Sequence, residues 1–271
     1  MRDIYKLLVF TPSYNRAHTL ERCYNSIVEQ NYDDMTWLVV DDGSTDETCN
    51  LINRLKSENK INIEYHYQDN AGKQGAWNYA VKFAQDFDLF LCVDSDDVMY
   101  AGALKNIEKY FTYLKSEDVI GLRCLAIRNS TLLADSKYSN DLIFKASWFD
   151  ELISKNLGER VDVFKPQILI QYLFPVTEEI KFVPESWFYC KSAMKYKFIY
   201  LSIPVTLFYD EHTHLRLSKS GIKKHAKGQQ IARGALLRHV PMKVWRANPT
   251  LAFKTLLRYL QSYCYAFLAR D

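Results

Sequence analysis

The sequence lacks the cysteine spacings that mark disulfide frameworks or zinc sites. Its six cysteines are scattered over 271 residues without a CxxC pair, so we expect reduced thiols in an intracellular, cytoplasmic protein. We also expect no signal peptide, and we find no apolar run long enough to cross a membrane, no internal repeat and no low-complexity linker. These absences exclude small disulfide-rich domains and solenoids, and they favour one large globular domain, alone or with a C-terminal extension.

Acidic residues are missing from the last part of the chain. Between His212 and Arg270 there are twelve lysines or arginines and no aspartate or glutamate. The net charge of +3 therefore combines +11 for residues 212–271 with −8 for the first 211 residues. This segregation predicts that the tail meets an anionic partner. No nucleic-acid-binding motif accompanies the basic residues, so we do not expect that partner to be nucleic acid.

The same tail carries apolar residues at helical spacing. They are Phe253, Leu256, Leu257, Leu260, Cys264, Phe267 and Leu268, with Lys254, Arg258 and Arg270 elsewhere around the helix. A basic amphipathic helix can lie on an anionic membrane surface, which would make the protein peripheral on the inner face of the plasma membrane. The alternatives are that the apolar face packs on the rest of the chain or across a homodimer, and the sequence favours none of the three.

Apolar runs alternate with amphipathic helical patterns through the first 115 residues. The runs at 6–11, 37–40 and 89–93 and the alternating segment 62–67 predict strands, and helical stripes follow them. This alternation predicts an α/β fold with a Rossmann-like, mostly parallel central sheet flanked by helices.

Two local signals refine this pattern. Ser44 and Glu47 have the spacing of a capping box, which predicts the start of the second helix. Ile203 and Pro204 argue against one central strand over residues 198–209, because proline cannot donate to the ladder.

Three acids follow the most apolar of these strands. Leu89–Val93 is followed directly by Asp94, Asp96 and Asp97. Carboxylates this close repel one another unless a cation or a hydrogen-bonding ligand lies between them. Ligands bind at the carboxyl ends of strands in open α/β sheets, so we predict a Mn²⁺ or Mg²⁺ site with Asp96 as the first choice of ligand and Asp94 and Asp97 as further ones. The alternative is that these acids only cap the next helix.

Four ordered motifs resemble glycosyltransferase family 2, the inverting group with the GT-A fold. They are Thr11–Asn15, Val40–Asp46, Asn70–Gly72 with Gly75, Ala76 and Asn78 beyond, and Asp94–Asp97. The resemblance covers about residues 4–115 and then thins to the short match Phe182–Glu185. It implies a GT-A catalytic domain over residues 1–215 and a basic helical extension over 216–271. Within the domain, residues 1–115 would form the nucleotide-sugar-binding half and 116–215 the acceptor-binding half.

The resemblance also implies a nucleotide-sugar donor whose diphosphate leaving group is neutralised by the divalent metal. In relatives the acid at the position of Asp41 recognises uracil, which favours a UDP-linked donor. The donor-binding residues implied are Thr11, Pro12, Ser13, Tyr14, Asp41, Asn70, Gly72, Lys73, Asp94, Ser95 and Asp96. Asp42 and Asp46 fit structural roles in a turn and a helix start better. Many relatives carry an arginine where this chain has Trp77. The positive charge of that arginine is missing here unless Lys73 supplies an equivalent charge.

An inverting transfer needs a base that removes the proton of the acceptor hydroxyl. The family supplies an aspartate or glutamate from the second half of the domain, and Glu185 is our candidate, with Glu178 and Glu179 as competitors. In some GT-A enzymes a late histidine completes the metal shell, which makes His212 or His214 a candidate ligand; the alternative is that both are surface loop residues.

These expectations predict a metal-dependent inverting glycosyltransferase of surface polysaccharide biosynthesis, acting on a glycan or a lipid-linked saccharide. One alternative is a nucleotidylyltransferase, which would carry a glycine-rich basic loop after the first strand, where this chain has Pro12–Asn15. The other is a non-catalytic nucleotide-binding assembly partner, against which the intact Asp94, Asp96 and Glu185 argue.

Overall fold

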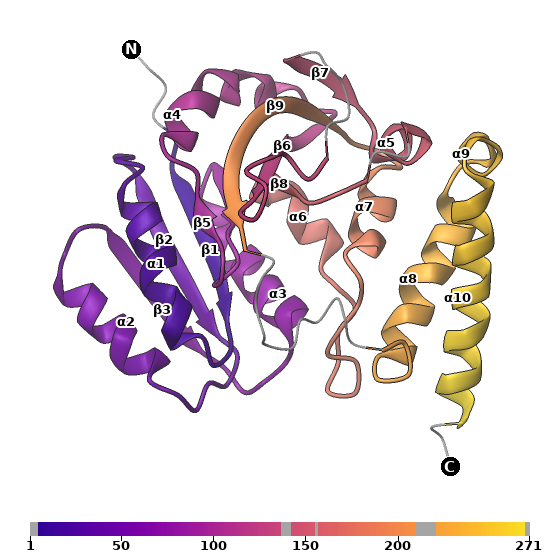
Figure 1. Cartoon of the computed structure of the whole chain (residues 1–271), viewed down its shortest axis with the longest axis horizontal. Coiled ribbons are helices and arrows are strands. Elements are labelled where there is room, and N and C mark those ends of the chain that lie inside the picture. Colours follow the sequence, from indigo (N-terminus) through magenta and orange to yellow (C-terminus); the bar gives the residue numbers. More distant parts are fainter. Residues whose placement is uncertain (1–4, 137–141, 155–156, 210–220, 269–271) are drawn as a thin grey trace.

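The computed structural model describes residues 5–136, 142–154, 157–209 and 221–268. They form a nine-stranded sheet with helices on both faces (Figure 1). The strands are β1 (Leu7–Ser13), β2 (Met35–Asp41), β3 (Asn62–Tyr67), β4 (Leu89–Cys92), β5 (Val98–Met99), β6 (Val119–Arg128), β7 (Ile143–Ala146), β8 (Arg160–Phe164) and β9 (Lys197–Phe208). Their order is β3-β2-β1-β4-β8-β6-β9-β5, and β7 pairs with β9 outside this path.

The helices alternate with the strands in the first half of the chain and gather at its end. They are α1 (Ala17–Val28), α2 (Thr48–Ser57), α3 (Lys73–Phe83), α4 (Ala103–Ile107), α5 (Trp148–Ser154), α6 (Pro166–Leu169), α7 (Ser186–Ser192), α8 (Ala226–His239), α9 (Met242–Ala247) and α10 (Pro249–Leu268). Short 3₁₀ helices follow α3, α4 and α6, at Ala84–Asp86, Glu108–Lys115 and Ile170–Tyr172. None of the helices within the described ranges combines the length and the hydropathy needed to span a bilayer.

The first half of the sheet is parallel and is organised around β1. This strand pairs in parallel with β2 and β4, and β2 pairs in parallel with β3. Successive side chains of a strand point to opposite faces: Leu7 and Val9 pack with α1 and α2, whereas Leu8 and Phe10 pack with α3. The α/β fold class with a sheet between two helical layers is confirmed, and the four predicted strands of this half are present.

The second half of the sheet is mixed. β8 joins β4 and β6 by antiparallel pairing, and β9 pairs in parallel with β6 and antiparallel with β5 and β7. The prediction of two strands separated at Ile203 and Pro204 is wrong, because β9 runs unbroken and curls over the sheet (Figure 1). Pro204 lies opposite Leu125, where the register of the β6–β9 pairing shifts. Such an irregularity tolerates a residue without an N–H.

The predicted capping box is also wrong. α2 begins at Thr48, and Glu47 makes no side-chain cap at its start. Asp46 instead accepts hydrogen bonds from the N–H of Thr48 at 3.1 Å and from its hydroxyl at 2.6 Å. The hydroxyl of Ser44 accepts from the N–H of Asn15 at 2.8 Å, so it ties the loop after β2 to the loop after β1.

A buried ion network holds the second half together. The guanidinium of Arg123 on β6 donates to Glu151 on α5 at 3.1 Å and to Asp162 on β8 at 2.6 Å. Glu151 also accepts from Arg160 at 2.7 Å, and Asp162 accepts from the hydroxyl of Tyr189 at 2.7 Å. Because both acids are almost fully buried, each depends on its donors for the hydrogen bonds that water would otherwise supply.

We predict that Arg123→Ala destabilises the fold by about 3–5 kcal/mol, because it leaves two buried carboxylates without their shared partner. Urea unfolding measures the change. Arg54→Ala is the matched control: Arg54 pairs with Glu21 at 2.9 Å, but both side chains are more than half exposed, so the expected loss is less than about 1 kcal/mol. Equal losses in the two variants would contradict the assignment.

Candidate active site

Three parallel strands deliver the candidate site to one edge of the sheet. The register pairs Ser13 at the end of β1 with Asp41 at the end of β2. The strand β4 ends beside them at Cys92, and the N–H of Val93 donates to the carbonyl of Phe10 at 2.9 Å. We refer to the ends of β1, β2 and β4, with the loops that follow them, as the carboxyl edge.

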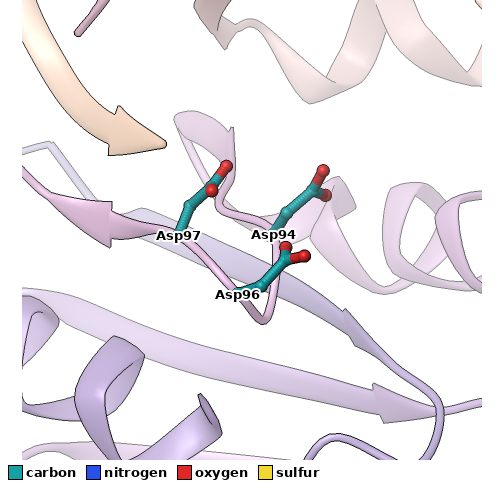
Figure 2. A group of neighbouring side chains, drawn as sticks. All are labelled: Asp94, Asp96 and Asp97. Atoms are coloured by element: carbon teal, nitrogen blue, oxygen red, sulfur yellow. The ribbon is translucent and has the colours of Figure 1, made fainter. Parts of the chain in front are cut away.

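The acids after β4 form a tight cluster at the carboxyl edge. One oxygen from each of Asp94, Asp96 and Asp97 lies within 4.8 Å of the others, and the three carboxylates point to the same side of the loop (Figure 2). Burial raises the pKa of Asp97 well above its usual range, and the charges of Asp94 and Asp96 raise it further. The tip of β9 closes the cluster, since the N–H of Tyr209 donates to Asp97 at 3.3 Å. The arrangement suits a hard divalent cation, which would relieve this repulsion.

Arg22 positions this loop, and sequence analysis missed it. Its guanidinium donates to the carbonyl oxygen of Asp96 at 2.6 Å and lies 3.7 Å from the ring centroid of Tyr209. It therefore joins α1, the acid loop and the residue that follows β9. An arginine on the polar face of an amphipathic helix gives no sequence signal of such a contact.

Lys73 places a positive charge beside the cluster. It is the first residue of α3, and its ammonium donates to the carboxylate of Asp94 at 2.7 Å. Burial would lower the pKa of Lys73, but the charge of Asp94 outweighs it, so the pKa lies well above that of a free lysine.

Trp77 does not reach the carboxyl edge. Its ring packs edge-on against Phe90 and Phe164, with centroids 5.0 and 5.9 Å away, inside the core cluster beneath α3. The position where many relatives carry an arginine is therefore part of the core here, and Lys73 is the cation that α3 presents to the acids.

The start of α3 also reaches Glu185. Glu185 directly precedes α7, and its carboxylate accepts a hydrogen bond from the side chain of Gln74 at 3.3 Å. Gln74 is only 2% exposed and follows Lys73 in the chain. Two neighbouring residues of one helical turn therefore contact the acid cluster and the candidate base. Sequence analysis did not identify Gln74, because its partner lies 111 positions away.

The competitors of Glu185 lie in different surroundings. Glu178 is exposed, and Glu179 forms an ion pair with Lys227 of α8. Sequence analysis missed a further acid, Glu159, which directly precedes β8. Loss of hydration raises the pKa of Glu159, and the negative charge of Asp94 raises it further. The positive charge of Lys73 lowers the pKa and so acts against these two effects. Glu159 thus lies in the field of the same groups as Glu185.

Asp41 is the buried acid at the end of β2. It is 1% exposed, and its two oxygens accept from the N–H of Ser44 at 2.8 Å and from the hydroxyl of Tyr65 at 2.7 Å. Burial and this bond to Asp41 raise the pKa of Tyr65 well above its ordinary value.

The end of β1 carries two further predicted donor-binding residues. Tyr14, which directly follows β1, is 52% exposed. The hydroxyl of Ser13 is buried and finds no hydrogen-bond partner among the described residues.

Two predicted donor-binding side chains have other partners. Thr11 is fully buried, and its hydroxyl accepts from the indole N–H of Trp37 at 2.9 Å. Asn70 donates to the carbonyl of Asp42 at 2.9 Å. Both side chains thus help to hold the loops of the carboxyl edge, and their contact with a donor stays a prediction. Asp42, assigned a structural role from the sequence, accepts from the N–H groups of Ala71 and Gly72 at 2.7 and 2.8 Å.

Gly72, one of the predicted donor-binding residues, has a structural reason to be glycine. A Cβ at Gly72, where φ is +83°, would lie 1.9 Å from the carbonyl oxygen of Lys181. This glycine therefore permits a close approach to the chain before α7. Of the remaining predicted residues, Pro12 is half-buried and Ser95 is buried at the carboxyl edge, whereas His212 and His214 lie outside the described residues.

Comparison with known proteins places these features in a family. The model of "Glycosyl transferase family 2" matches residues 8–169. An uncharacterized glycosyltransferase from Nostoc sp. is 32% identical over 117 residues, which are 43% of this chain and 35% of that protein. The hyaluronan synthase of Pasteurella multocida is 33% identical over 103 residues, 38% of this chain and 10% of the synthase. The chain thus matches about a third or less of the length of these relatives.

Solved structures share the fold at low identity. Staphylococcus aureus TarS 1–349 in complex with UDP-GlcNAc superimposes with a TM-score of 0.70 and 18% identity, covering 95% of this chain and 72% of that one. A mannosyltransferase from Pyrobaculum calidifontis, in complex with GDP-Man and Mn²⁺, gives a TM-score of 0.63 and 17% identity over 98% and 75% of the two chains. The fold is therefore the GT-A fold.

We predict that Gly72→Ala destabilises the protein by more than about 3 kcal/mol, because both its dihedral angles and the carbonyl of Lys181 oppose a side chain. Urea unfolding measures the loss. Gly102→Ala is the matched control, since Gly102 also has a positive φ, +67°, but a Cβ there would meet nothing within 4 Å. Strain alone then predicts about 1–2 kcal/mol. Equal losses of stability in Gly72→Ala and Gly102→Ala would contradict the predicted clash with the Lys181 carbonyl.

Proposed function

The chain belongs to glycosyl transferase family 2, and from this we propose that it is a metal-dependent, inverting enzyme that moves a sugar from a UDP-linked donor to a saccharide or a lipid-linked saccharide. The observation that carries the proposal is the convergence on one helical turn of α3. Lys73 contacts the acid cluster at Asp94, and Gln74 contacts Glu185. The acid cluster and the candidate proton acceptor are therefore both in contact with the first turn of α3.

The acid cluster would hold the cation. Carboxylate oxygens from Asp94, Asp96 and Asp97 are the ligand type that Mn²⁺ and Mg²⁺ prefer, and their spacing within 4.8 Å fits a single ion. When bound, the ion would neutralise the charge that develops on the diphosphate leaving group. A fold neighbour solved with GDP-Man and Mn²⁺ supports this choice of cofactor. Lys73 would add a second positive charge on the same side.

The ends of β1 and β2 would bind the nucleotide. Each oxygen of Asp41 accepts one hydrogen bond within the protein, which leaves a second lone pair on each for an N–H of the base. Tyr14 offers an exposed ring for stacking, and the unpartnered hydroxyl of Ser13 offers a polar contact. A fold neighbour solved with UDP-GlcNAc supports UDP as the nucleotide.

Glu185 would be the general base. Its carboxylate accepts the acceptor hydroxyl's proton while that oxygen attacks the anomeric carbon and the bond from this carbon to the diphosphate breaks. Gln74 donates an N–H to this carboxylate, which fixes the direction of the Glu185 side chain. Attack and departure on opposite faces of the sugar ring invert the configuration.

The relatives favour polysaccharide synthesis over the other candidate activities. The matched hyaluronan synthase builds a polysaccharide by its name, so we infer a glycan acceptor in surface polysaccharide biosynthesis. Nucleotidylyl transfer is not favoured, because the family match covers the acid cluster and the loop after β1 lacks the glycines expected of that class.

We predict that UDP raises the melting temperature in the presence of Mn²⁺ and that EDTA removes the metal-dependent part of this shift.

Asp96→Asn should weaken Mn²⁺ binding by at least about tenfold, because it removes a ligand from the cluster. Calorimetric titration with Mn²⁺ measures the affinity. Asp86→Asn, at an exposed acid of the 3₁₀ turn after α3, should leave it unchanged. Unaltered Mn²⁺ affinity in Asp96→Asn would refute the metal assignment.

We predict that Glu185→Gln lowers kcat by about 10²–10⁴-fold while the dissociation constant for UDP changes less than about twofold, because the amide cannot accept the proton but keeps the shape of the site. Transfer from a panel of UDP-sugars to saccharide acceptors measures kcat. Glu178→Gln, on the exposed loop, is the control and should retain full activity. If Glu159→Gln abolished transfer and Glu185→Gln did not, the base would be Glu159.

A further inference from the structure

The last helix packs on the protein through its polar side. α10 lies along α8 at the outer edge of the molecule (Figure 1). Thr255 and Ser262, which lie two helical turns apart, are fully buried, and the ring of Tyr259 between them comes within 3.4 Å of the Cβ position of Gly234 on α8. The inward face of α10 therefore carries small hydroxyl side chains and a tyrosine, and near its start Leu251 packs against the hydrophobic cluster around Leu236 and Val244.

The apolar side of α10 faces away from the protein. Its large side chains are exposed by 43–67%. They are Phe253, Leu256, Leu257, Leu260 and Phe267, and Tyr263 and Cys264 are exposed beside them. These positions lie on the side opposite Thr255 and Ser262, since an α-helix turns by 100° per residue. The alternative that the apolar face packs on the rest of the chain is therefore wrong for the described residues. We refer to this exposed surface as the outward face of α10.

Positive charge borders the outward face. Lys254 and Arg258 are exposed on one flank of α10, and Arg246 is exposed on α9 just before it. None of the three forms an ion pair with any residue in the described part of the chain. Residues 221–268 contain no acid at all. The charge of Arg258 even acts on Arg233 of α8, where burial first and then this like charge lower the pKa.

Charge complementarity decides between the two remaining occupants. A second copy seated on the outward face would bring a second set of bases to it, and residues 221–268 of neither copy contain an acid to balance them. An anionic phospholipid surface supplies acyl chains that can contact the leucines and phenylalanines, and phosphates that can pair with the bases. Contiguous apolar exposure of this kind marks an interaction surface.

We propose that the outward face of α10 binds an anionic phospholipid membrane. The helix lies in the plane of the interface, with Phe253, Leu260 and Phe267 inserted at the boundary between headgroups and acyl chains. Lys254 and Arg258 contact lipid phosphates from the flank. The buried hydroxyl face keeps α10 attached to α8, so the rest of the molecule is held at the membrane surface.

Co-sedimentation of the full chain with vesicles tests the proposal. We expect binding to vesicles of equal parts phosphatidylcholine and phosphatidylglycerol, and at least about tenfold weaker binding to phosphatidylcholine alone. Lys254→Gln with Arg258→Gln should weaken binding to the anionic vesicles by roughly thirtyfold, since each base near such a surface contributes about fivefold in affinity. Lys56→Gln with Lys82→Gln, which removes two exposed charges elsewhere, should leave binding unchanged.

The apolar contribution has its own variants. Phe253→Ser and Leu260→Ser should each weaken binding by about tenfold. Leu133→Ser, at a side chain that is 69% exposed far from the tail in sequence, is the matched control. Because all these side chains are exposed, the melting temperature should stay within a few degrees of the parent, which separates lost binding from lost fold.

Two results would overturn the proposal. The first is equal binding to neutral and anionic vesicles, which would leave no role for the bases. The second is absence of binding to both. If the chain were then dimeric by light scattering and Leu260→Ser made it monomeric, the occupant would be a second copy. None of these measurements depends on glycosyl transfer, so the proposal and the proposed function can fail separately.

Discussion

The ion pair between Lys73 and Asp94 is the contact on which the arrangement of the site depends. Three carboxylates crowd the loop after β4, and Lys73 is the cation that contacts one of them directly. Its position is fixed because it is the first residue of α3, and Gln74 next to it holds Glu185. A shift at the start of this helix would therefore move the cation and the candidate base together.

The start of α3 is fixed in turn by Asp42. This buried carboxylate accepts hydrogen bonds from Ala71 and Gly72, and its own carbonyl accepts from Asn70. The loop before α3 is thus bound to the end of β2, while Gly72 lies against the carbonyl of Lys181 in the segment that leads to α7. One short loop thus connects the carboxyl edge of the sheet with the segment that leads through Glu185 into α7. The contacts of Asp42 and the close approach at Gly72 therefore act on the same loop.

The parts of this architecture that sequence predicted are those governed by local pattern. β1 to β4 and α1 to α3 follow from buried apolar runs and helical stripes, and the acid cluster follows from its position after β4. β7 and β8 and the unbroken β9 could not be predicted, because their pairing joins segments far apart and Pro204 is accommodated only by the register shift with β6. Arg22, Gln74 and Glu159 escaped for the same reason: their partners are distant in sequence.

Periodicity predicted that α10 is amphipathic but not which side faces the protein. The orientation depends on the packing partner: α10 lies along α8, where Gly234 leaves room for the ring of Tyr259, and Thr255 and Ser262 are buried on the same side of α10. An interface of hydroxyl groups buries little apolar area, and the hydrophobic gain scales with that area. The Thr255 hydroxyl is even buried without a partner among the described residues. Most of the large apolar side chains of α10 are therefore still exposed on the other side.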